Sequence, residues 1–311
     1  MPALQRPIPP AFRSKIERHY GERGTAWLAT LPAVLATCEE QWDIRLEAGP
    51  IDNLSYNYII PGVRADGRRI VVKAGLPHEK ELFTEMEALR LFAGRGTVEL
   101  FEADRDLAAM LLERLEPGTT LRQVQARDDA EATRLAAPLL RDVRGPLPAG
   151  TALPSLADWA QVLQRVKPFL PDSPLSPAWI ERAEALMDAL QPPLEEAALI
   201  HGDLHHDNIV YDRRRGWLAI DPKGLIGDPA YNAARFLNNW WDSPPPTPAA
   251  VEQRLRLIEA ATGFAVERLA GWGFVDCVIG NSWTLEDGHA DDTWPHMTAY
   301  LDGSLGPFLP I

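Results

Sequence analysis

Residues 198–228 read ALIHGDLHHDNIVYDRRRGWLAIDPKGLIGD. Two short apolar runs in this stretch, 208–211 and 217–220, flank a polar segment of three arginines and a glycine at 212–216. Short apolar runs on either side of a polar, glycine-containing segment are typical of two buried strands joined by a solvated turn. The sequence therefore predicts a small β-hairpin at the centre of this stretch.

Three polar side chains are expected at one end of this hairpin. Asp203 precedes the first strand, Asn208 begins it, and Asp221 ends the second strand. Because the two strands are antiparallel neighbours, these positions lie close together. Converging oxygen-bearing side chains suit a hard cation such as Mg²⁺ and the phosphates that it carries.

The spacing of these residues resembles the catalytic loop of kinases. Asp203 precedes Asn208 by five residues, as in H-R-D followed by four residues and Asn, and Asp221 stands where D-F-G has its Asp. The loop reads H-G-D at 201–203, as in the aminoglycoside phosphotransferase family. Within that family, the stretch is most similar to the streptomycin 6-phosphotransferase and hydroxyurea phosphotransferase branch.

The resemblance implies a bilobal, protein-kinase-like α+β fold. Residues 1–115 would form a nucleotide-binding N-terminal lobe, with an antiparallel sheet and a helix. Apolar residues at helical spacing predict an additional N-terminal helix at 26–42. Residues 116–311 would form a larger, mostly helical lobe for catalysis and acceptor binding.

From the residues themselves, 1–13 is expected to be extended, because it is rich in proline. Strands are expected at 43–48, 54–60, 69–74, 98–102 and 108–115, and helices at 79–94, 121–143, 155–169, 177–190, 229–241, 249–262, 265–284 and 291–303.

Lys73 ends the third expected strand, in a Val-Val-Lys sequence that resembles the kinase V-A-I-K. The resemblance implies that Lys73 grips the α- and β-phosphates of ATP. A Glu on the following helix should pair with it. We choose Glu85 from the four candidates Glu79, Glu81, Glu85 and Glu87.

The segment between the first two strands departs from the glycine-rich kinase pattern. Residues 47–55 do not read G-x-G-x-x-G. Gly49, Asn53 and Ser55 are candidate phosphate contacts through their backbone N–H groups. A simple hairpin turn explains this segment equally well.

The sequence around Glu113, Arg114 and Leu115 resembles the hinge between two lobes. The family resemblance implies that backbone groups here bind the adenine of ATP. Pro117 and Gly118 follow, and this pair is expected to break regular structure.

The resemblance gives each loop residue a role in phosphoryl transfer, with ATP and Mg²⁺ as cofactors. Asp203 would orient the attacking hydroxyl or accept its proton, and Asn208 and Asp221 would hold Mg²⁺. His201 is expected to hold the backbone of the loop.

The acceptor implied by the resemblance is a small molecule, cationic or polyhydroxylated, such as the aminoglycoside streptomycin, or hydroxyurea. Carboxylates and indole rings recognise guanidinium and ammonium groups. Among the acidic and aromatic residues of the C-terminal lobe, we select Glu286 and Asp287 as substrate contacts. The remaining candidates, for which caps and core packing are the simpler interpretation, are Trp240, Trp241, Asp242, Trp283, Asp291 and Asp292.

Composition limits the other possibilities. The chain has 311 residues, 46% of them hydrophobic, and a net charge of −13. Such an acidic chain argues against a nucleic-acid partner. The sequence has neither a membrane-spanning apolar run nor a secretion signal, and its two cysteines are expected to be reduced core residues. We therefore expect a cytoplasmic monomer or weak dimer that binds no membrane.

Three alternatives remain open at this point. The protein could be a kinase of the same fold that acts on a small metabolite, or a nucleotide-binding pseudokinase that serves as an interaction module. His201 and His205 also have the H-x-x-x-H spacing of a zinc hydrolase, but the intervening Gly-Asp-Leu lacks the Glu of that motif.

Overall fold

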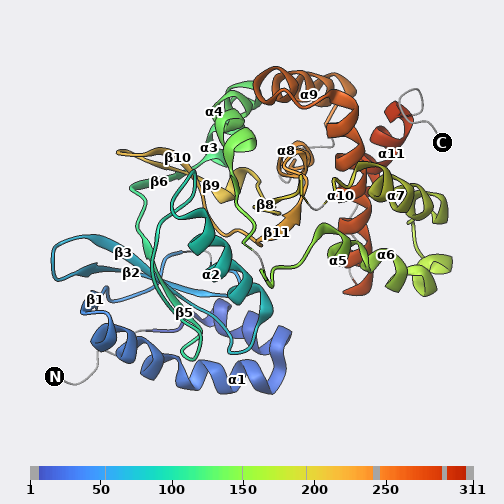
Figure 1. Ribbon diagram of the computed structural model, residues 1–311. Helices are drawn as coiled ribbons and strands as arrows, with labels where there is room; N and C mark the ends of the chain where they lie inside the picture. Colours follow the sequence, from blue (N-terminus) through green and yellow to red (C-terminus); the bar gives the residue numbers. More distant parts are fainter. Residues whose placement is uncertain are drawn as a thin grey trace. The chain divides into compact units, whose positions relative to one another are not determined.

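The structure is a computed structural model, and it describes residues 7–52, 54–148, 150–193, 195–240, 246–288 and 293–305. The α+β chain forms two compact units (Figure 1). The N-terminal unit comprises Met1–Gly94 and Val98–Glu116, and the C-terminal unit comprises Arg95–Thr97 and Pro117–Ile311. No helix in the described part of the chain combines the length and apolarity needed to cross a membrane.

A five-stranded antiparallel sheet forms the centre of the N-terminal unit, in the order β1-β2-β3-β5-β4. The third strand has the predicted bounds, whereas β2 begins at Tyr58 rather than at 54. Tyr58 pairs with Ala74, which is the last residue of β3. Residues before Tyr58 therefore have no partner in β3. The strands are β1 (Ile44–Leu46), β2 (Tyr58–Arg64), β3 (Arg69–Ala74), β4 (Leu100–Asp104) and β5 (Ala109–Glu113).

The N-terminal helix is longer than predicted. Helix α1 spans Pro10–Gln41, so the expectation of an extended chain up to residue 13 is wrong for its last residues. Proline is tolerated in the first turn of a helix, where its missing N–H would have no partner. The added segment buries Phe12 and Ile16 in one core with Trp27 and with strand residues such as Ile60. A kink at Gly21, with φ 58° and ψ −133°, separates the two parts of the helix.

The predicted hairpin is present in the C-terminal unit as β9 (Ile209–Asp212) and β10 (Gly216–Ala219), which pair antiparallel. A third strand, β6 (Pro117–Thr120), pairs with β9, so Pro117 and Gly118 do not end regular structure as predicted, although the register of the pairing shifts between Pro117 and Thr119. Proline fits here because β6 is an edge strand, where a missing N–H is tolerated. A second small sheet has the order β11-β8-β7, with β7 (Arg144–Gly145), β8 (Ala198–Ile200) and β11 (Leu225–Gly227).

Two of the expected helices are divided. The segment 121–143 forms α3 and α4 because Asp128 caps a new helix, its side chain accepting from the N–H of Glu131 at 2.9 Å. The segment 155–169 forms α5, α6 and a 3₁₀ turn, η1, that contains two prolines. The helices are α2 (Lys80–Phe92), α3 (Leu121–Gln125), α4 (Asp129–Asp142), α5 (Leu156–Ala160), α6 (Val162–Arg165), α7 (Pro177–Leu190), α8 (Ala230–Leu237), α9 (Pro248–Thr262), α10 (Val266–Glu286) and α11 (Thr293–Leu305), with η1 at Lys167–Asp172.

Helix α10 is the core of the C-terminal unit (Figure 1). It packs against α6, α7, α8, α9 and α11, and its central residues from Leu269 to Ser282 are buried. Cys277 lies in this core, and Cys38 lies in the N-terminal core; both are buried free thiols, as predicted. Because α8 packs on α10, the side chains of α8 can join the core of this unit to the loop that precedes β9.

Candidate active site

The loop 201–208 lies beside the segment 220–224, and backbone contacts hold the two together. The carbonyl of His201 accepts from the N–H of Lys223 at 2.8 Å, and the N–H of Ile220 donates to the carbonyl of Asn208 at 2.9 Å. Strand β8 enters this loop and pairs with β11, which follows the second segment. The hairpin and the small sheet therefore bring both predicted motif segments to one place, as the sequence indicated.

His201 holds the loop, which is the role predicted for it. It is fully buried, and its Nε2 contacts the carbonyl of Ile220 at 2.9 Å, while its Nδ1 accepts from the N–H of Asp203 at 3.2 Å. Burial lowers its pKa to about 4, so the ring is neutral and Nε2 is the donor. Both ring nitrogens are thereby used, which argues against the zinc alternative. In the described part of the chain, no group of three or more His, Cys, Asp or Glu could hold a metal ion.

Gly202 is fixed in a conformation that other residues rarely adopt. Its φ is +81°, and a Cβ atom there would lie 2.7 Å from Cδ1 of Leu225. Its N–H donates to Oδ1 of Asn232 at 3.1 Å, and the amide of Asn232 donates in turn to the carbonyl of Val143. Both backbone geometry and crowding therefore require glycine at this position.

We expect Gly202→Ala to destabilise the protein more than Gly216→Ala. Each substitution places an L side chain at positive φ, which costs about 1–2 kcal/mol. Gly216 has a φ of +80°, and a Cβ atom there would have no other atom within 4 Å, so only Gly202→Ala adds a clash with Leu225. Urea unfolding of both variants measures the difference. Equal stabilities would show that Leu225 moves aside at no cost.

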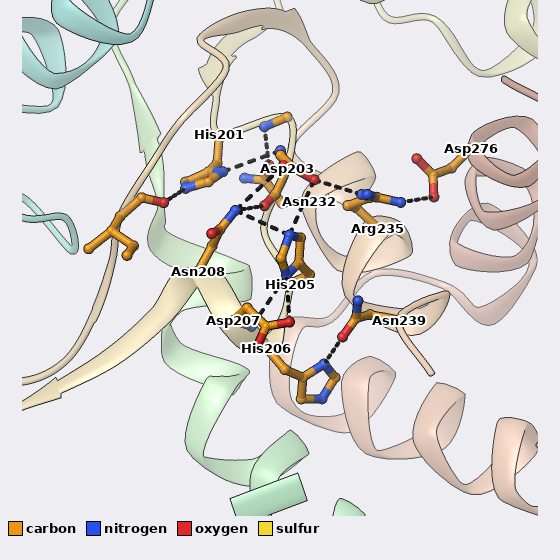
Figure 2. Close-up of polar contacts among 12 residues, drawn as sticks. His201, Asp203, His205, His206, Asp207, Asn208, Asn232, Arg235, Asn239 and Asp276 are labelled. Carbon is orange, nitrogen blue, oxygen red and sulfur yellow. Dashed lines mark hydrogen bonds and ion pairs between the residues drawn. The ribbon is translucent and has the colours of Figure 1, made fainter. Parts of the chain in front are cut away.

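Asp203 lies at the centre of the site (Figure 2). Its Oδ1 accepts from Nε of Arg235 at 2.9 Å, and its Oδ2 lies 3.5 Å from Nδ2 of Asn208. Burial would raise the pKa of Asp203, but the adjacent His205 and the Arg235 guanidinium outweigh burial and hold this pKa below its ordinary value. Asp203 is therefore ionised at neutral pH and has one oxygen held firmly and the other held loosely.

Asn208 and Asp221 are the two oxygen-bearing residues predicted to hold a cation. Nδ2 of Asn208 donates to the backbone carbonyl of Asp203 at 2.9 Å, so its amide oxygen is the group available to a cation. Asp221 follows β10 with a φ of 62°, and its charge acts on both His201 and His205. An amide oxygen and a carboxylate are ligands that suit Mg²⁺, so these residues fit the predicted cation.

The rest of the loop is anchored to surrounding helices. His206 is buried, stacks on Phe236 of α8 with 4.0 Å between ring centroids, and has its Nδ1 2.9 Å from Oδ1 of Asn239. Asp207 forms an ion pair with Arg122 of α3 at 2.7 Å. These contacts fix the part of the loop that immediately precedes Asn208.

Sequence reasoning missed Arg235, which contacts Asp203 from α8. It also missed the neighbours of Arg235: Asp276 on α10, and Tyr231 and Asn238, which bind Asp276. Residues 231 and 235 of α8 and the C-cap residue 238 recur at helical spacing, so they lie on one side of this segment. Three polar residues at this spacing, beside a further polar residue at 232, were the available signal.

In the N-terminal unit, Lys73 pairs with Glu85, the partner chosen from the sequence. Nζ of Lys73 lies 2.8 and 2.6 Å from the two carboxylate oxygens, and each residue is only 4% exposed. Two of the other candidates have partners outside this pair: Glu79 binds Arg23, and Glu87 binds Arg90.

The structure describes the surroundings of all but one of the remaining predicted nucleotide contacts. Asn53 lies outside the described residues. A Cβ atom at Gly49 would meet open space, and Oγ of Ser55 accepts from the N–H of Tyr56 at 2.6 Å. The N–H groups of Glu113 and Arg114 donate to the carbonyls of Glu99 and Arg69, so the prediction of adenine binding now rests on the carbonyls and on Leu115. The roles of all these residues stay predictions.

The predicted substrate residues lie at the C-terminal end of α10. Glu286 forms an ion pair with Arg165 at 2.8 Å, so its carboxylate already has a cationic partner, and Asp287 caps the helix end as the next residue. Trp240 is buried under Arg254, and Trp283 packs against Trp159. The other acceptor candidates, Trp241, Asp242, Asp291 and Asp292, lie outside the described residues.

Comparisons with known proteins show which proteins this chain is similar to. Residues 41–288 match the family described as aminoglycoside/hydroxyurea antibiotic resistance kinase. The chain is 32% identical to streptomycin 6-kinase of Streptomyces griseus, over 90% of this chain and 92% of that protein. It is also 32% identical to hydroxyurea phosphotransferase of Kitasatospora aureofaciens, over 87% of this chain and 78% of that protein.

Solved structures share the fold. A thermostable mutant of the aminoglycoside phosphotransferase APH(4)-Ia, in a ternary complex with ADP and hygromycin B, aligns with a TM-score of 0.62 at 17% identity, over 87% of this chain and 98% of that one. Choline kinase LicA from Streptococcus pneumoniae aligns with a TM-score of 0.59 at 15% identity, over 90% of this chain and 100% of that one. The protein-kinase-like fold predicted from the sequence is thereby confirmed.

Proposed function

Because this chain belongs to the aminoglycoside/hydroxyurea antibiotic resistance kinase family, we propose that it transfers the γ-phosphate of Mg·ATP to a hydroxyl of a cationic aminoglycoside such as streptomycin. The chain is a small-molecule phosphotransferase that uses ATP. The observation that carries the proposal is the ionised carboxylate of Asp203, which has one oxygen held by Arg235 and lies beside Asn208.

The acceptor is proposed from charge and from the relatives. Two streptomycin 6-kinases, from Streptomyces griseus and Streptomyces glaucescens, match this chain over 92% of their own lengths. Streptomycin carries guanidinium groups, which an acidic chain of net charge −13 would attract. Hydroxyurea is the second candidate, because its phosphotransferase is equally identical to this chain.

Asp203 would accept a hydrogen bond from the acceptor hydroxyl through Oδ2 and take up its proton. The hydroxyl oxygen would form its bond to the γ-phosphorus while the bond from that phosphorus to the bridging oxygen breaks and ADP leaves. This type of general-base assistance contributes about 10²–10⁴-fold to a rate. Most of the remaining catalysis in phosphoryl transfer comes from positioning and charge stabilisation. The rigid contacts of His201 and Asn208 to the backbone of Asp203 would supply that positioning.

Asn208 and Asp221 would hold Mg²⁺. When bound there, the cation would neutralise charge on the phosphate oxygens. Lys73, fixed by Glu85, would grip the α- and β-phosphates of the same nucleotide. Backbone groups of Glu113, Arg114 and Leu115 would bind the adenine, and those of residues 49–55 would approach the phosphates.

A panel of acceptors tests the proposal. The purified protein is incubated with ATP and Mg²⁺ in the presence of streptomycin, hydroxyurea, other aminoglycosides or small polyhydroxylated metabolites, and the release of ADP is followed. We expect release that depends on streptomycin. Turnover with hydroxyurea alone would select the second candidate, and turnover with a metabolite alone would overturn both. ATP binding without turnover on any acceptor would favour a pseudokinase.

A further inference from the structure

Arg235 lies between two carboxylates of the C-terminal unit (Figure 2). Its Nε donates to Oδ1 of Asp203 at 2.9 Å, and its Nη1 lies 3.5 Å from Oδ2 of Asp276. The side chain of Arg235 is 16% exposed, and that of Asp276 is 4% exposed. Burial would lower the pKa of Arg235, but the two carboxylates outweigh this effect and raise it, so the guanidinium remains charged.

Asp276 is itself fixed by two donors. The hydroxyl of Tyr231 donates to its Oδ1 at 2.8 Å, and Nδ2 of Asn238 donates to its Oδ2 at 2.9 Å. Burial and the Asp276 charge raise the pKa of Tyr231 well above its ordinary value, so this hydroxyl keeps its proton. A continuous set of hydrogen bonds and ion pairs therefore connects α10, through α8, to the loop at Asp203.

The backbone and the side chain of Asp203 are held by different groups. His201 and Asn208 fix its N–H and its carbonyl, and neither restricts rotation of the carboxylate strongly, since Nδ2 of Asn208 lies 3.5 Å from Oδ2. Oδ1 has a short contact with Nε of Arg235, at 2.9 Å, and a longer one with Nε2 of His205, at 3.7 Å, so the arginine contributes most to setting that rotation. It follows that Oδ1 is engaged and that Oδ2 is the oxygen left to meet a hydroxyl.

We propose that Arg235, held by Asp276, is a positioning residue that fixes the carboxylate of Asp203 so that Oδ2 faces the acceptor hydroxyl. This inference rests on the proposed function of Asp203. It assigns to α8 and α10 a part in the reaction that no loop motif reveals. Misplacement of a catalytic group by about 1 Å can cost 10²-fold in rate, so the expected effect is large.

A double-mutant cycle tests the inference, since an effect that acts through Asp203 must disappear when the carboxylate is removed. Arg235→Met should reduce kcat about 10- to 100-fold and leave the KM for ATP unchanged. In the Asp203→Asn background, the same change should leave the residual single-turnover rate nearly unaltered. Asp276→Asn, which keeps the shape of the side chain, should reduce kcat less, and Arg235→Lys should restore part of the loss by restoring the charge.

Arg182→Met is the matched control. Arg182 is 18% exposed, binds the carboxylate of Asp302 between α7 and α11, and lies outside the loop, so its loss should leave kcat unchanged.

An equal loss from Arg235→Met with and without the Asp203 carboxylate, or full activity in Arg235→Met, would overturn the inference. If Arg235→Met does not fold, Arg235→Lys and Asp276→Asn decide, and full activity in both overturns it. Full activity in Asp203→Asn alone would instead refute the proposed function.

Discussion

Asp203→Asn is expected to reduce kcat by about 10²–10⁴-fold while the affinity for ATP stays unchanged. The substitution keeps the shape of the side chain and its contacts with Arg235 and Asn208 as far as an amide allows, but it removes the group that takes up the proton. Steady-state turnover with streptomycin and a direct titration of nucleotide binding measure the two quantities separately.

Asp207→Asn provides the control for this prediction. Asp207 lies four residues further along the same loop, is 38% exposed and pairs with Arg122 rather than with a reacting group. A partly exposed ion pair of this kind contributes little, about 0–1 kcal/mol. We expect Asp207→Asn to remain active. Comparable losses in the two variants would mean that the loop, and not the Asp203 carboxylate, is what the reaction requires.

Glu85→Gln is expected to lower kcat/KM for ATP strongly and to destabilise the N-terminal unit. The pair of Lys73 and Glu85 is buried, and loss of one partner from a buried ion pair costs about 3–5 kcal/mol because the other charge is left unbalanced. A lysine that has lost this carboxylate is also no longer held in one place to grip the phosphates. Thermal unfolding and kinetics at varied ATP concentration test both effects.

Glu87→Gln gives a control on the same helix. Glu87 lies two residues from Glu85, but its side chain is 35% exposed and pairs with Arg90, and this pairing lowers the pKa of Glu87. We expect its substitution to change neither stability nor kcat/KM for ATP by a measurable amount. If both glutamine variants behave alike, the buried pair has no special role in nucleotide use.

The parts that could be predicted from the sequence depend on local patterns. Strand β3 has the predicted bounds, since its apolar run is bounded by polar residues and turn signals. The hairpin β9–β10 and the neighbouring loop were predicted because the motif residues are close in sequence. The pairing of Lys73 with Glu85 followed from the order of strand and helix together with the family resemblance.

The parts that could not be predicted depend on contacts between distant segments. Strand β6 forms because it pairs with β9, and nothing in the sequence at Pro117 and Gly118 indicates that partner. The contact of Arg235 with Asp203 joins residues 32 positions apart, and that of Asp276 with Asn238 joins residues 38 apart. The start of α1 was not predicted because the first residues of the chain are rich in proline. Burial of Phe12 and Ile16 favours a helix there, and that burial requires the folded sheet.

The most direct measurement follows label from the γ-phosphate of ATP into streptomycin, with the unsubstituted protein and with Asp203→Asn. We predict that the unsubstituted protein produces labelled phospho-streptomycin and ADP in equal amounts, and that Asp203→Asn, which still binds ATP, produces almost none. Label that appears only in inorganic phosphate, or equal labelling of streptomycin by both proteins, would contradict the account.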